Sequence, residues 1–174
     1  TYTLTATTGT PSVNRETESN DTMATADALT SGVAISAQTS EVGNPNSGST
    51  NNDLDYYKID ATAGQEISVN FDGEMAYSGS HYEAGWSVEI VDGSGNVLGG
   101  ADLRDGTLKA TVSADGTYYV KVDPSSGRSV QQGDTYTLTA TTGTPSVNRE
   151  TEPNDGLATA DVLSSGVSIS GQTS

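Results

Sequence analysis

The chain of 174 residues contains no cysteine and only one histidine. Without cysteine there can be no disulfide, so a copy outside the cell needs another source of stability, and a bound metal ion is the obvious substitute. A zinc site would have to consist mostly of carboxylates. A serine–histidine–aspartate triad lacks any supporting motif such as a nucleophile elbow. We therefore expect no enzymatic activity.

Basic residues and long apolar runs are also scarce. Seven lysine and arginine residues oppose 23 aspartate and glutamate residues, which gives a formal net charge of −16. This charge disfavours the phosphate backbone of nucleic acid and favours cations as partners. Hydrophobic residues make up 32% of the chain, and no apolar run approaches the length that spans a membrane. The sequence predicts neither a nucleic-acid partner nor membrane insertion.

The two ends of the chain have nearly the same amino-acid sequence. Residues 1–40 align without a gap with residues 135–174, and 33 of the 40 positions are identical. Such close repetition indicates a window cut from a tandem array. In this interpretation residues 1–15 are the last strand and linker of one repeat, residues 16–142 are a complete repeat, and residues 143–174 are a linker and the opening of the next.

Alternation of apolar with polar residues dominates the complete repeat. It is typical of short strands, and turn sequences rich in glycine and aspartate separate them. The segments concerned are 33–38, 55–61, 66–72, 86–92, 107–112, 116–123 and 135–141. They predict an all-β protein, an antiparallel β-sandwich with at most one short helical turn near residues 21–29. Because the connection between them is short, we expect residues 135–141 to lie beside residues 116–123.

The stretch ETESND at residues 16–21 returns as ETEPND at residues 150–155. Its spacing puts Glu16, Glu18 and Asn20 on one side of an extended segment, and Asp21 follows at the corner. Like charges so close together repel one another. A calcium ion, which accepts many carboxylate and amide oxygens in flexible geometry, would remove that repulsion. The alternative is an acidic linker that is simply solvated.

The order of the motifs resembles that of the bacterial pre-peptidase C-terminal domain, a family that includes the collagen-binding domains of clostridial collagenases. The matching text is ETESNDTMATADAL, GVAISAQ, NNDLDYYKIDATAGQEISVNF, SVEIVDGSGNVL, DGTYYVKV and YTLTAT. The resemblance implies a jelly-roll-like sandwich that binds Ca²⁺. The ligands that it implies are Glu16, Glu18, Asn20 and Asp21, with Asp53 or Asp55 and possible help from Asn52, and Glu150, Glu152, Asn154 and Asp155 in the second copy.

Spacing adds to that implication, because Asp53 and Asp55 are two residues apart at the start of a strand and face the same way. Which oxygens of the polar loop 40–52 join the site is left open. The second copy has no counterpart of Asp53 and Asp55 in these residues. We expect its site to be weaker unless a neighbour completes it.

The stretch 73–86 gathers Tyr77, His81, Tyr82 and Trp86 in a chain that is otherwise poor in aromatic residues. Amphipathic aromatic side chains on a loop are typical of a surface that contacts carbohydrate or peptide. The alternative is that Trp86 begins a strand and points into the core. A second glycine-rich stretch, DGSGN at residues 92–96, resembles half of a calcium loop, but a tight hairpin turn is the better interpretation.

These features predict a non-enzymatic, calcium-stabilised repeat that extends a large extracellular or cell-surface bacterial protein, such as an adhesin or a filament-like array. Calcium would fix the angle between neighbouring repeats, which would meet head to tail. Two alternatives remain open: an extracellular module that binds a polysaccharide or protein ligand through residues 73–86, and an accessory domain of a secreted protease.

Overall fold

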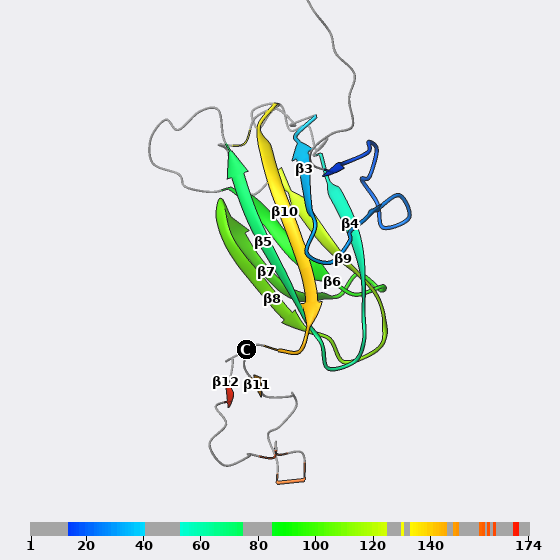
Figure 1. Ribbon diagram of the computed structural model, residues 1–174, viewed down its shortest axis with the longest axis vertical. Helices are drawn as coiled ribbons and strands as arrows, with labels where there is room; N and C mark the ends of the chain where they lie inside the picture. The colour runs from blue at the N-terminus through cyan, green and yellow to red at the C-terminus, as the bar shows by residue number, and fades with distance from the viewer. Residues whose placement is uncertain are drawn as a thin grey trace, which may run out of the picture.

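The computed structural model describes residues 14–40, 53–74, 85–124, 130 and 133–145, together with the short pieces 148–149, 157–158, 160, 162 and 169–170. Two five-stranded sheets pack face to face (Figure 1). Sheet A contains, in spatial order, β1 (Asn14–Arg15), β3 (Ala34–Gln38), β10 (Thr135–Gly143), β5 (Glu66–Glu74) and β8 (Asp105–Thr111). Sheet B contains β2 (Asp27–Ala28), β4 (Asp55–Ala61), β9 (Gly116–Asp123), β6 (Trp86–Val91) and β7 (Val97–Leu103).

The prediction of an all-β sandwich is confirmed, with one difference in strand direction. Most neighbours are antiparallel, but β1 runs parallel to β3, and β2 runs parallel to β4. Both sheets are therefore mixed. The described residues contain no α-helix, and one hydrogen-bonded turn occurs near residue 23, where the amide of Thr25 donates to the carbonyl of Thr22 at 3.0 Å.

The expected place of residues 135–141 is wrong. This strand, β10, does not pair with β9 but lies in the opposite sheet between β3 and β5. Strand β9 is already flanked by β4 on one side and β6 on the other. The chain therefore crosses between the sheets after β9, and β10 finds nine paired positions along β5.

The core is built from the inward positions of the alternating strands. Its largest side chains form one aromatic cluster, in which Tyr136 stacks on Phe71 with ring centroids 5.0 Å apart and meets Trp86 at 5.8 Å. Trp86 is completely buried (0% exposed). The expectation that Trp86 belongs to a ligand-contacting surface is therefore wrong, and the alternative that it begins a strand and faces the core holds.

Residues 14–28, which we call the strap, connect the edges of the two sheets. The strap begins as β1 beside β3 in sheet A and ends as β2 beside β4 in sheet B. Between these ends the amide of Tyr56 donates to the carbonyl of Asn20 at 3.0 Å. The acidic residues of the strap are thereby held where the β3 edge of one sheet approaches the β4 edge of the other (Figure 1).

The second copy of the opening text forms the same local strand pair. Strand β11 (Asn148–Arg149) runs parallel to β12 (Ile169–Ser170), and Asn148 lies opposite Ile169. In the first copy Asn14 lies opposite Ile35, which is the same pairing shifted by 134 residues. The proposed boundaries of the repeats stay predictions, and residues 1–13 lie outside the described part of the chain.

Candidate metal centre

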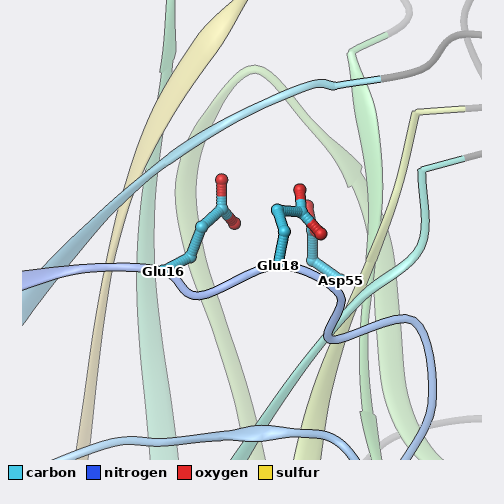
Figure 2. Close-up of side chains that lie close together, drawn as sticks. All are labelled: Glu16, Glu18 and Asp55. Atoms are coloured by element: carbon cyan, nitrogen blue, oxygen red, sulfur yellow. The ribbon is translucent and has the colours of Figure 1, made fainter.

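Carboxylates of the strap and of β4 meet at one end of the sandwich. One ligand oxygen each from Glu16, Glu18 and Asp55 lie within 4.8 Å of one another, and the same holds for Glu18, Asp21 and Asp53. Figure 2 shows Glu16 and Glu18 rising from the strap toward Asp55. The two groups share Glu18. The five carboxylates that the sequence singled out in the first copy are thus brought together.

The remaining predicted ligands fall into two classes. The structure describes Asn20, which lies between Glu18 and Asp21 in the sequence and is completely buried (0% exposed). The four predicted ligands of the second copy, Glu150, Glu152, Asn154 and Asp155, lie outside the described residues. The same is true of three aromatic candidates, Tyr77, His81 and Tyr82.

Polar atoms of two buried side chains at the cluster lack hydrogen-bond partners within the described residues. Both the oxygen and the nitrogen of the Asn20 carboxamide are unpaired, and so is Oδ1 of Asp55, a residue that is 1% exposed. A buried polar atom without a partner costs stability, on the order of 1–3 kcal/mol for each group. A bound cation would satisfy the unpaired oxygens of Asn20 and Asp55.

A pair of core tyrosines links the two halves of the cluster. The Tyr57 hydroxyl donates to Glu16 Oε2 at 2.8 Å, and the Tyr136 hydroxyl donates to Asp55 Oδ2 at 2.5 Å. The two hydroxyl oxygens are 2.7 Å apart. The sequence analysis missed both residues. The inward alternation that Tyr57 shares with Asp55 on β4 could have found the first, but no local signal connects Tyr136 with this site.

Backbone and hydroxyl donors fix the outer carboxylates. The amide of Gln38 donates to Glu16 Oε1 at 2.6 Å. Ser40 donates to Asp53 twice, from its amide at 2.6 Å and from its hydroxyl at 2.7 Å. The sequence left open which oxygens of the polar loop 40–52 join the site. Within that loop, Ser40 orients the carboxylate of Asp53, and residues 41–52 lie outside the described part of the chain.

Burial makes these carboxylates costly to ionise. Desolvation is the main reason that the pKa of Glu16 rises to about 7 and that of Asp55 to about 9. Hydrogen bonds from the Gln38 amide and from Tyr136 oppose the two shifts, respectively. Desolvation also raises the pKa of Glu18, and the neighbouring Asp53 adds to that shift. A cation would offset both desolvation and repulsion, because it favours the charged form of each group.

The raised pKa values predict how the stability of the cation-free protein depends on pH. Glu16 and Asp55 have ordinary values of 4.5 and 3.8, so the folded protein binds more protons than the unfolded chain above those values. Stability is then highest below the ordinary values and is lost as pH rises through about 7 and about 9. In the presence of EDTA, we expect unfolding by urea to need less denaturant at about pH 8 than at about pH 5.

The residues fit calcium rather than a transition metal. The donor set consists of carboxylates and one carboxamide, which are hard oxygen ligands, and the described residues of the cluster include no imidazole or thiolate. If calcium binds, Glu16, Glu18, Asp21, Asp53 and Asp55 would hold it, with the buried carboxamide of Asn20 able to contribute its oxygen. The ion would supply positive charge that binds the strap to β4.

The stretch DGSGN, which resembles half of a calcium loop, is a turn, as expected. Residues 92–96 join β6 to β7, and the Asp92 carboxylate accepts hydrogen bonds from the amides of Ser94 at 2.8 Å and Asn96 at 2.9 Å. Those donors satisfy the carboxylate within the hairpin. The turn therefore explains this stretch without a metal ion.

Comparison with known proteins gives one family. Residues 53–124 match the family of the bacterial pre-peptidase C-terminal domain. The matched part runs from Asp53 to the end of β9, so it includes Asp53 and Asp55 but not the acidic strap. No curated protein matches the chain. In the residues that the structure describes, no helix is long and apolar enough to cross a membrane.

Solved structures also match the chain, and one of them covers much of its length. It is the crystal structure of PliG from Aeromonas hydrophila, a periplasmic lysozyme inhibitor of g-type lysozyme. The alignment has a TM-score of 0.41 and 18% sequence identity, and it covers 67% of this chain and 98% of that chain.

Proposed function

We propose that this chain is a calcium-stabilised, non-enzymatic extender module of a large secreted or cell-surface bacterial protein. The observation that carries the proposal is the meeting of two strap carboxylates, Glu16 and Glu18, with Asp55, whose buried Oδ1 has no hydrogen-bond partner in the described part of the chain. A bound calcium ion would join the strap to β4 and remove the repulsion among the carboxylates. The matched family supports an extracellular location, because its domains occur in secreted proteins.

Calcium would act at the place where one repeat follows another. The strap begins with the last two residues of the segment 1–15, which the sequence assigns to the last strand and linker of the preceding repeat. When the strap is fixed to the sandwich, the direction in which the chain enters the sandwich is fixed as well. Calcium would thereby turn a flexible string of domains into a stiffer array.

A short connection between repeats supports head-to-tail neighbours. Strand β10 ends at Gly143, and the pair formed by β11 and β12 begins at Asn148. Five residue steps span at most roughly 18 Å. Since β11 and β12 repeat the register of β1 and β3, we propose that a second strap starts within this distance of the first sandwich. The connection therefore limits how far apart neighbouring repeats can lie.

Limited proteolysis tests whether calcium holds the strap. Arg15 is exposed in β1, directly before the first ligand, Glu16. If calcium fixes the strap, trypsin should cut after Arg15 at least about tenfold more slowly with calcium than with EDTA, which corresponds to about 1.4 kcal/mol of coupling. Mass spectrometry of the fragments over time would measure the rate.

The Glu18→Gln variant is the matched control, because it removes the carboxylate that both triads share while keeping the side-chain length. We expect its cleavage rate to be nearly the same with calcium and with EDTA. Equal rates under both conditions in the unaltered protein would contradict the proposed role of calcium at the strap.

A further inference from the structure

A polar groove of about 640 Å³ runs from the metal centre over the outer face of sheet A. Its floor consists of two cross-strand rows from β3, β10 and β5. Thr135 lies between Gln38 and Glu74 in one row, and Thr137 lies between Ser36 and Asp72 in the other. The strap supplies one wall, which includes two of the three carboxylates of the first cluster, Glu16 and Glu18.

This groove offers many more acceptors than donors. Among the described residues, four carboxylates line it, those of Glu16, Glu18, Asp72 and Glu74, and Arg15 is the one cationic side chain. Hydroxyls of Ser36, Thr135 and Thr137 act either way. A complementary ligand must therefore donate several hydrogen bonds. An anionic ligand would be repelled by the carboxylates.

The metal centre adds a second requirement for the ligand. Calcium takes six to eight oxygen ligands, and water or a ligand molecule fills the positions that the protein leaves open. Two of the groove-lining carboxylates, Glu16 and Glu18, belong to the same cluster as Asp55, whose buried Oδ1 has no partner among the described residues. A cation at this cluster would consequently border the groove and could be coordinated by an oxygen atom of a ligand that lies in it.

We propose that the groove is a binding site for carbohydrate, in which neighbouring hydroxyl groups of a sugar bind the calcium ion while the others donate to Asp72 and Glu74. The inference rests on the calcium site of the proposed function and extends it to a ligand. A sugar suits both requirements, because each hydroxyl supplies an oxygen for the cation and a proton for a carboxylate. This site differs from the aromatic stretch at residues 73–86 that the sequence suggested for such a ligand.

An ammonium group is the competing ligand, since it also donates several hydrogen bonds to carboxylates. The two ligands respond to calcium in opposite ways. A sugar needs the cation as a partner, whereas an ammonium group would compete with the cation for the same carboxylates. Calcium dependence therefore distinguishes a carbohydrate from a basic side chain of a protein partner.

Amide chemical shifts of the full chain test the proposal in three steps. Calcium is added first, and shifts at Glu16, Glu18 and Asp55 report whether it binds. The methyl glycosides of mannose, fucose and galactose are then titrated, with ethylammonium chloride as the competing probe. We expect at least one sugar to shift the amides of Ser36, Thr135 and Thr137 with calcium present and to have no effect in EDTA.

Matched variants locate the sugar. Thr137→Val removes a groove hydroxyl without touching a carboxylate, and it should weaken sugar binding roughly two- to tenfold, the loss expected for one hydrogen bond. Thr141→Val makes the same change on the same face of β10, outside the groove, and should leave the affinity unchanged. Equal affinity of the Thr137→Val variant and the unaltered protein would overturn the placement.

The other outcomes are also decisive. Calcium shifts without any sugar shift would overturn the carbohydrate site and leave the calcium-dependent module standing. Ethylammonium shifts that are stronger in EDTA, without sugar shifts, would overturn it in favour of a basic protein partner. An absence of calcium shifts would overturn this inference together with the proposed function.

Discussion

Calcium should raise the melting temperature of this protein by about 10 °C or more, and EDTA should reverse the change. A ligand that binds only the folded state at 100 times its Kd adds about 2.7 kcal/mol, and at 1,000 times about 4.1 kcal/mol. For a domain of this size each kcal/mol moves the melting temperature by roughly 3–5 °C. Circular dichroism with temperature would measure the effect. Sodium at the same ionic strength should not reproduce it.

The Asp55→Asn variant distinguishes the loss of calcium binding from any effect of the Asp55 carboxyl group on stability by itself. Burial raises the pKa of Asp55 to about 9, so the group is neutral at neutral pH when no cation is bound. The carboxamide has nearly the same shape, so the variant in EDTA should melt close to the unaltered protein at neutral pH. It should nevertheless lose most of the stabilisation by calcium, because a buried ligand charge is missing.

Asp102→Asn is the matched control for that experiment. It makes the same chemical change at an exposed position of β7 in sheet B. We expect calcium to stabilise this variant as much as the unaltered protein. If Asp55→Asn kept the full calcium effect, the cluster around Asp55 could not be the site of binding.

Gly73→Ala should destabilise the fold by about 3 kcal/mol, the upper end of the range for overpacking a core. A Cβ atom on Gly73 would lie 2.2 Å from Cζ3 of Trp86, which is far inside van der Waals contact. Trp86 is completely buried and packs against Phe71 and Tyr136, so the extra atom would displace closely packed aromatic side chains. Since Trp86 is the single tryptophan of the chain, its fluorescence during urea unfolding would measure the change.

Gly116→Ala is the corresponding control in another strand. A Cβ atom at this position of β9 meets nothing within 4 Å. Because alanine loses less backbone entropy than glycine on folding, we expect this variant to be equally stable or more stable by about 0.5–1 kcal/mol. A Gly73→Ala protein as stable as Gly116→Ala would show that the aromatic cluster tolerates the extra atom.

The metal centre was predictable in its acidic ligands and not in its tyrosines. Glu16, Glu18 and Asp21 are close in the chain, and Asp53 and Asp55 share one face of a strand start, so local spacing was enough to nominate them. Tyr136 lies 81 residues from Asp55 in the sequence. Nothing local to either residue indicates that a strand from the other sheet will bring its hydroxyl to that carboxylate.

By itself the sequence determined seven of the strands, β3 to β6 and β8 to β10, and which acidic residues gather, whereas β1, β2 and β7 lie outside the segments that it predicted. Both depend on periodicity over a few residues, since alternation sets which side chains of a strand face the core. Only the tertiary structure decided the neighbours of those strands. It placed β10 between β3 and β5, buried Trp86 and aligned the two rows of the groove floor, because strand order and register depend on long-range pairing across the whole sandwich.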